Sequence, residues 1–146
     1  MKSMLFKLVV VGKIKDPHYQ AKINEFLTRL NVFGKVEVVE LKDDSIEKES
    51  LAILKTLESE KGWVIVLDER GANITSVELA KKMNDCDRKI VLVIGGAFGF
   101  TDDVRKRADY LLALSKFTVT HEMARLIAVE QLYRACTIIA NKKYHH

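Results

Sequence analysis

The feature that most constrains this chain is a regular alternation of short apolar runs with amphipathic helical segments. Apolar runs rich in β-branched residues lie at 5–11, 36–41, 63–67, 90–94 and 110–114. Their composition is typical of strands buried on both faces of a sheet. Segments with helical spacing of apolar residues follow each run. This order predicts an α/β domain of three layers, built around a mostly parallel sheet.

The length and composition are those of one globular domain. The chain has 146 residues, of which 48% are hydrophobic and 30% are charged, and it contains no repeat or interior linker. We therefore expect a single domain over residues 1–146. The net charge of +4 is compatible with a polyanionic partner and equally with an ordinary solvated surface.

Targeting and redox signals indicate a cytoplasmic protein without a membrane segment. The first apolar run spans about seven residues and continues into patterned sequence, so it predicts a strand and not a signal peptide. No stretch is long enough to cross a bilayer. Cys86 and Cys136 have no metal-ligand spacing with each other or with the histidines, and are expected to be reduced thiols. We expect no metal site.

Local signals predict where the helices begin and end. Asp16 and Pro17 indicate one helix start, and Gly34 is expected to close that helix. Capping boxes are predicted at Asp44 with Glu47 and at Thr75 with Glu78, and a loop is predicted over 68–73. The final helix, about 121–141, is apolar on more than one face, which predicts a partner surface, most simply a symmetric homodimer.

Two strand ends predict a ligand crevice. The strand at 90–94 runs into the glycine-rich loop 95–100, and the strand at 110–114 runs into the loop 115–120. Ligands of open α/β sheets bind where such strand ends meet. The glycine loop matches neither the P-loop nor the dinucleotide fingerprint. Its glycines allow close backbone approach to a flat ligand, although a tight turn would account for them as well.

Several polar residues follow this crevice in the sequence. His121 and Arg125 are four apart and share a helix face next to the second loop; both could also be structural, His121 at the helix start and Arg125 as a surface cation. Glu130 and Arg134 have the spacing of an intrahelical ion pair. The tail 141–146 mixes basic and aromatic residues, which suits RNA but also a frayed end or a tag. The absence of G-x-S-x-G and of a Cys–His pair argues against hydrolases.

The runs IGGAFGF, LSKFTVTHEMARLIAVEQLYRA and the terminal YHH resemble the RlmH family of SPOUT methyltransferases. These enzymes methylate N3 of a pseudouridine in the intersubunit stem-loop of bacterial 23S ribosomal RNA. The resemblance extends over nearly the whole chain, including the opening strand and VIVLDERG. It implies a deep C-terminal trefoil knot over about 90–146, which sequence rules alone would exclude. It also implies a homodimer with sites at the interface, acting on ribosomes.

The resemblance further implies roles for individual residues. S-adenosylmethionine would be bound in the knot by Leu67, Gly96, Ser115, Lys116, Phe117, Thr118, Val119 and Thr120. A neutral adenosine with a cationic sulfonium needs close backbone and an apolar wall, which agrees with the missing phosphate motifs. We expect His121 to act as general base and Arg125 as partner of an oxyanion or phosphate. RNA recognition would involve Tyr133, Arg134, Tyr144 and His145.

The chain departs from the family pattern at three positions. Phe98 replaces a residue that is often acidic or polar, Thr120 a frequent Pro, and His146 a frequent Arg or Lys. Two other interpretations stay open. One is a catalytically silent ribosome-binding or assembly factor on the same scaffold, and the other an unrelated nucleotide-binding protein of the flavodoxin or Rossmann type, against which the missing phosphate fingerprint counts.

Overall fold

The computed structural model describes residues 3–146 and consists of five strands alternating with five helices. Their bounds are β1 Met4–Val11, α1 Pro17–Leu30, β2 Gly34–Leu41, α2 Ile46–Thr56, β3 Trp63–Asn73, α3 Ser76–Cys86, β4 Ile90–Ile94, α4 Asp102–Arg107, β5 Tyr110–Ala113 and α5 His121–Ile139. The strands form one sheet in the order β2-β1-β4-β3-β5, and all its pairs are parallel. The predicted α/β class is confirmed.

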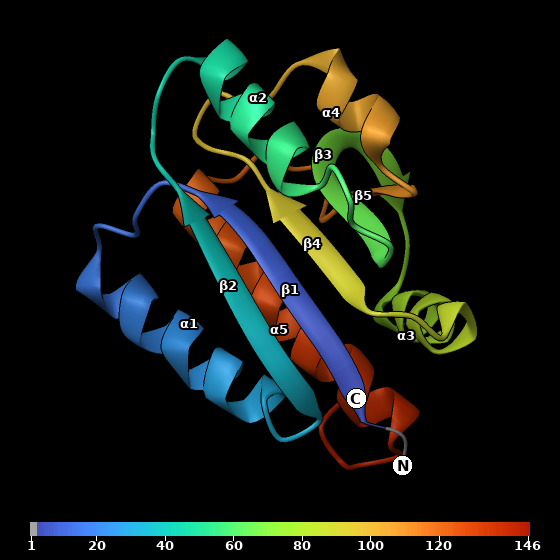
Figure 1. The fold of residues 1–146 in the computed structure, drawn as a ribbon. Helices are drawn as coiled ribbons and strands as arrows, with labels where there is room; N and C mark the ends of the chain where they lie inside the picture. The colour runs from blue at the N-terminus through green and yellow to red at the C-terminus, as the bar shows by residue number, and fades with distance from the viewer. Residues whose placement is uncertain (1–2) are drawn as a thin grey trace.

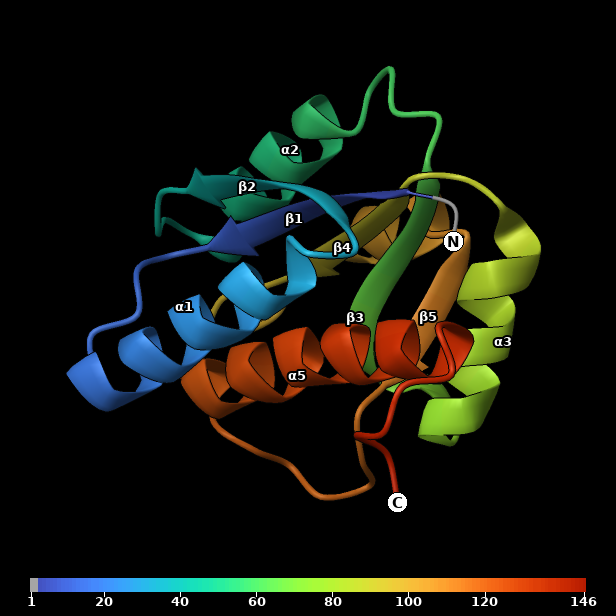
Figure 2. The same ribbon diagram turned by 90° about the horizontal axis from the view of Figure 1, so that it is seen from below.

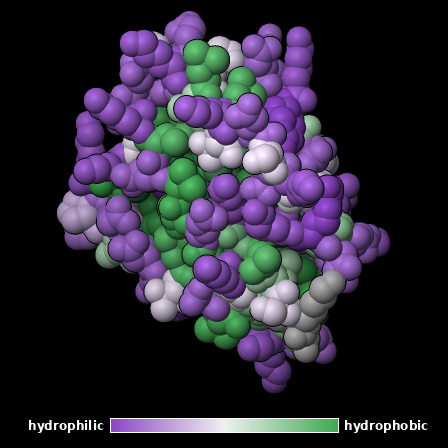
Figure 3. All heavy atoms as spheres, in the orientation of Figure 1, coloured by the Kyte–Doolittle hydropathy of each residue, from purple (hydrophilic) through white to green (hydrophobic). Residues whose placement is uncertain are grey.

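Helices cover both faces of this sheet. Figures 1 and 2 show α2 and α4 on one face, and α1, α5 and α3 in a row on the other. Figure 3 shows that the face with α2 and α4 is largely polar outside, with a narrow band of apolar side chains along its middle. The three predicted layers are therefore present, with the charged sides of the helices outward.

Alternating residues of the strands supply the two halves of the core. In β1, Leu8 and Val10 belong to the cluster under α1, α3 and α5, while Val9 and Val11 belong to the cluster under α2 and α4. All five residues of β4 are buried. Burying one such side chain fully contributes about 1.5–3 kcal/mol, so the central strands are the most stabilised part of the sheet.

The predicted helix boundaries hold in part. Asp16 caps α1, and the Thr75–Glu78 capping box of α3 is confirmed. The box at Asp44 is wrong, because Ser45 is the cap that accepts from the backbone of Lys48. Gly34 does not end α1 but begins β2. A Cβ there would lie 1.6 Å from the Met4 carbonyl oxygen, so the close approach of the chain requires glycine.

Strand β3 is longer than predicted. The expected loop over 68–73 is wrong, because β3 continues to Asn73 through a bulge between Leu67 and Ala72. Ala72 and Asn73 then pair with the end of β5. Gly71 permits this path, since its Cβ would come within 2.7 Å of the backbone of Leu112. The bulge bends β3 locally, and its residues Asp68, Glu69 and Arg70 line the crevice described below.

Helix α5 lies between α1 and α3 beneath the sheet (Figure 2). Its inner residues Ala128, Val129 and Leu132 are buried in the core, and on a further side Tyr133 packs against the rings of Phe26 and Phe33. The apolar residues on more than one face of α5 are thus partly used inside the subunit. They do not by themselves require a partner chain.

Two general properties concern the described residues 3–146. No helix there combines the length and apolarity needed to cross a bilayer. Nor does this part of the chain contain a group of three or more His, Cys, Asp or Glu side chains able to hold a metal ion. Burial raises the pKa of the Cys136 thiol to about 12, so that thiol is not a nucleophile at neutral pH.

Candidate active site

A crevice of about 380 Å³ opens at the carboxyl ends of β3, β4 and β5. Its walls come from the end of β3 with the bulge, from the glycine loop after β4, from the loop after β5, and from the first turn of α5. The volume is within the range of sites that bind small molecules. It lies where the sequence predicted a ligand site, because parallel strands bring their carboxyl ends to one edge of the sheet.

The glycine loop forms a compact turn that exposes backbone to the crevice. The amide of Gly99 donates to the carbonyl oxygen of Gly96 (3.2 Å), and Gly99 has φ +81°, which favours glycine. A Cβ on Gly95 would lie 2.7 Å from the Phe100 ring. Gly96 backs onto the buried carboxylate of Glu49, which also accepts a bond from the Asp44 amide. The glycine loop is therefore a tight turn, and its glycines also present backbone to the crevice, so both interpretations given by the sequence apply.

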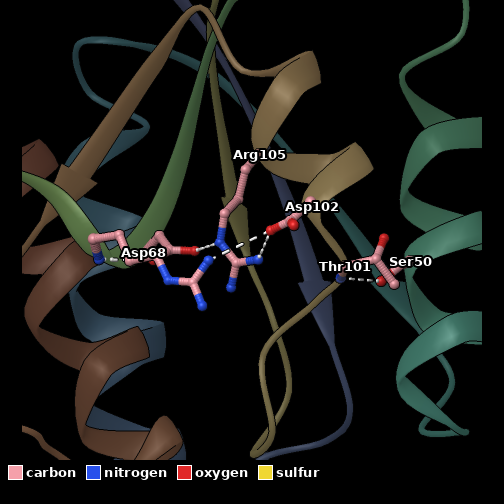
Figure 4. A network of polar contacts seen from close by, with 6 residues as sticks. Ser50, Asp68, Thr101, Asp102 and Arg105 are labelled. Atoms are coloured by element: carbon pink, nitrogen blue, oxygen red, sulfur yellow. Dashed lines mark hydrogen bonds and ion pairs between the residues drawn. The ribbon is translucent and has the colours of Figure 1, made fainter.

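Charged side chains on one wall neutralise each other (Figure 4). Arg105 donates to Asp68 through Nε and to Asp102 through Nη1 (2.8 Å). Burial alone would lower the pKa of the Arg105 guanidinium, but its bonds to the two carboxylates outweigh burial and raise it. The start of α4 is held by a bond from the Thr101 amide to the Ser50 hydroxyl (2.9 Å). The Arg105 cation of this wall is therefore already paired with two carboxylates.

The loop between β5 and α5 contributes the opposite wall. Ser115, Phe117 and Val119 line the crevice, whereas Lys116, Thr118 and Thr120 do not. The Ser115 hydroxyl accepts from the Phe117 amide (3.0 Å), and Thr120 caps α5 by accepting from the Met123 amide (3.3 Å). With Leu67 and Gly96, five of the eight residues predicted to bind the cofactor are brought together. The other three lie in the same loop but do not line the crevice.

The two predicted catalytic residues are separated. His121, the first residue of α5, lines the crevice and is partly exposed. Arg125, one turn later, is only 5% exposed and points under the end of β1, where Nη2 donates to the carbonyl oxygens of Val11 (2.8 Å) and Gly12 (3.0 Å). The sequence analysis expects Arg125 beside His121 as the partner of an oxyanion or phosphate, whereas the structure places Arg125 outside the crevice lining. At Arg125, helix α5 packs against the end of β1, so this side chain is buried. The spacing of residues within the helix could not indicate that contact.

Arg125 borders a second hollow of about 280 Å³ between α1, the sheet and α5. Its Nε is buried and has no partner among the described residues. Burial lowers the pKa of the guanidinium, opposed by the charges of Glu40, Glu122 and Asp43. The charge of Arg125 is thus directed toward β1 and these carboxylates.

The four residues predicted to contact RNA cluster at the other end of α5. Arg134 pairs with Glu130 (2.7 Å) as predicted, lies 4.8 Å from the Tyr144 ring centroid, and is 3.2 Å from Nδ1 of His145. Tyr133 meets the Tyr144 ring edge-on at 4.8 Å. Tyr133 is twelve residues after His121, so this cluster lies roughly 18 Å along the helix from the crevice of its own subunit.

Sequence reasoning missed two parts of this crevice. Asp68 and Arg105 are far apart in the chain, and their pairing depends on the extension of β3 beside α4. Phe98 was noted only as a departure from a family pattern, yet its side chain is 85% exposed at the crevice. An aromatic residue inside a glycine-rich loop was the available signal for it.

Comparisons with known proteins agree with this architecture. The family model described as "Predicted SPOUT methyltransferase" matches residues 4–145. The protein from Cytophaga hutchinsonii named "Ribosomal RNA large subunit methyltransferase H" is 39% identical over 155 residues, which cover 98% of this chain and 100% of that protein. The protein of the same name from Halothermothrix orenii is 39% identical over 159 residues, covering 97% and 99%.

Solved structures extend the likeness to the fold. A "probable methylase family protein" from Haemophilus influenzae has a TM-score of 0.62 at 15% identity, covering 97% of this chain and 70% of that one. The SpoU methyltransferase AviRb from Streptomyces viridochromogenes, in complex with the cofactor AdoMet, has a TM-score of 0.53 at 13% identity, covering 98% and 61%. At such identities the likeness concerns the fold alone.

Proposed function

This chain belongs to the SPOUT methyltransferase family, and we propose that it methylates large-subunit ribosomal RNA with S-adenosylmethionine as methyl donor. In detail, the substrate atom is N3 of a pseudouridine in the intersubunit stem-loop of 23S RNA, on assembled ribosomes in the cytoplasm. The names of the two relatives, which match 97–98% of this chain, support the RNA substrate. The observation that carries the proposal is the crevice, which combines exposed backbone, apolar walls and an internally neutralised Arg105.

The residues of the crevice fit S-adenosylmethionine. Leu67, Leu114 and Val119 offer an apolar wall for an adenine ring, and the two loops offer backbone groups for its polar edge. Because Asp68 and Asp102 already pair with Arg105, that guanidinium is not free for a pyrophosphate. This arrangement favours an uncharged adenosine over a dinucleotide, and the AdoMet complex of AviRb has the same fold.

His121 is the proposed general base. When bound, S-adenosylmethionine supplies an electrophilic methyl group, whose bond to sulfur breaks as the bond to nitrogen forms, leaving S-adenosylhomocysteine. The N3–H group has a pKa well above neutral, so the nitrogen must lose its proton to attack. His121 borders the crevice and can accept that proton. The walls contribute by holding the two reactants in line.

We also infer that the segment of about 90–146 is knotted and that two copies associate. β5 lies at one edge of the sheet. Residues 115–120 connect it to α5, which lies between α1 and α3 under the middle of the sheet (Figures 1 and 2). The cluster of Tyr133, Arg134, Tyr144 and His145 is too far from its own crevice to share one nucleotide with it. In a homodimer the tail of one subunit would instead serve the crevice of its partner.

The test is transfer of labelled methyl from S-adenosylmethionine to 70S ribosomes, separated subunits and naked 23S RNA, all from a strain that lacks this gene. We expect label in 23S RNA, located by mass spectrometry at N3 of a pseudouridine, with 70S particles as the best substrate. Label elsewhere in the RNA would refute the assigned position. Absence of both label and cofactor binding would favour the silent assembly factor.

A further inference from the structure

Two phenylalanines stand exposed at the mouth of the crevice. Phe98, in the glycine loop, and Phe117, in the loop before α5, each expose 85% of their surface, more than any other large apolar residue described. Both line the crevice, one from each loop. Exposed aromatic rings gathered at a concave site mark a place where a ligand or partner binds.

The surroundings of these rings favour a nucleic acid. Arg70 lines the same crevice, and its side chain is 70% exposed although it pairs with Asp102 (3.4 Å). Lys116, outside the crevice lining, is exposed directly before Phe117. Aromatic faces beside cations are the usual means of holding unpaired nucleobases next to phosphates. A Cβ placed on Gly99, next to Phe98, would meet nothing within 4 Å, so there is open room beside this loop.

We propose that the Phe98 ring stacks on a nucleobase of the RNA substrate as that base enters the crevice. The inference rests on the proposed function and names a residue that recognises its substrate. A base that reacts at a ring nitrogen must leave its stack to reach the methyl donor, and a planar apolar side chain replaces the stacking that is lost. Phe98 projects from the loop that borders the donor site and is free to do this.

The experiment compares Phe98→Ala, Phe98→Leu and Phe98→Trp with the wild type. The readouts are kcat/KM for 70S ribosomes, co-sedimentation with the same ribosomes, and calorimetric affinity for S-adenosylmethionine. We expect the Ala and Leu variants to lose about tenfold in kcat/KM, within the range of base–aromatic stacking. The Trp variant should stay close to wild type, and cofactor affinity should be unchanged. Co-sedimentation should weaken for Ala and Leu only.

Val32→Ala is the matched control, because Val32 is 76% exposed in the turn before β2, at the opposite edge of the sheet. It should match wild type in every readout. A Leu variant as active as wild type, or an equal loss of cofactor affinity, would overturn the stacking role. So would a change of oligomeric state in Phe98→Ala by light scattering. A wild type that methylates no RNA would refute the proposed function itself, whereas an active wild type with unaffected Phe98 variants would refute only this inference.

Discussion

Replacing Arg125 with Met separates a structural role from a catalytic one. The substitution removes two bonds from the guanidinium to the carbonyl oxygens of Val11 and Gly12. Each bond from a charged donor contributes about 1.5–3 kcal/mol to stability. Removing the buried, unpartnered Nε offsets this loss by about 1–3 kcal/mol, because its desolvation penalty disappears. Met also fills most of the space. We therefore expect a net loss of about 2–3 kcal/mol in the free energy of unfolding.

Urea denaturation measures this loss, and single-turnover methyl transfer at saturating ribosomes measures the chemical step. For a chain of this size the melting temperature should fall by about 5–10 °C. Below the transition, the methyl-transfer rate and the affinity for S-adenosylmethionine should change less than threefold. Arg88→Met is the control, because Arg88 is exposed and also donates to a backbone carbonyl, at 3.4 Å from Lys61. A rate reduced a hundredfold at unchanged stability would refute the structural role and restore Arg125 to the catalytic step.

Three further predictions concern the crevice and its support. His121→Ala should lower the methyl-transfer rate by about 10²–10⁴ without changing calorimetric cofactor affinity; an active variant would remove His121 from the mechanism. Gly71→Ala should destabilise the fold by about 1–3 kcal/mol in urea, since its Cβ would lie 2.7 Å from the Leu112 backbone; wild-type stability would contradict the bulge geometry. Burial tends to raise the pKa of Glu130, but bonds from Arg134 and Tyr144 outweigh it and lower the pKa below 4.5. Glu130→Gln should therefore be less stable than wild type at pH 7, and the difference should close as the pH falls below about 4.5 and the wild-type carboxylate is protonated; a constant difference down to pH 3 would contradict this.

The local periodicity of the sequence predicts most of the fold. Alternating residues of β1 pack on opposite faces as their pattern indicates, and the cap of α3 needs only Thr75 and Glu78. The extension of β3 could not be predicted, because it depends on contact between Gly71 and a strand some forty residues later. Likewise, Ser45 is the cap of α2 while Glu49 binds the Asp44 amide, a choice between neighbouring candidates that tertiary packing decides.

In the candidate site, too, the sequence predicts the features set by topology but not those set by tertiary contacts. Parallel topology alone brings Leu67, Gly96 and Ser115 to one crevice, so the sequence pattern locates it. The direction of the Arg125 side chain depends on how α5 is rotated against the sheet. The sequence does not indicate this rotation, because α5 packs against both α1 and α3 and is apolar on more than one face. The knot and the modified base come from the family resemblance and not from periodicity. They stay predictions of that resemblance.

The central claim is that the crevice at the ends of β3, β4 and β5 binds the methyl donor. Titration of ¹⁵N-labelled protein with S-adenosylmethionine, followed by amide NMR shifts, tests this most directly. We predict saturable shifts in the loops 95–100 and 115–121, with little change at Gln20 and Asn24 beside the second hollow. Shifts concentrated around that hollow, or no saturable shifts at all, would contradict the assignment of the site.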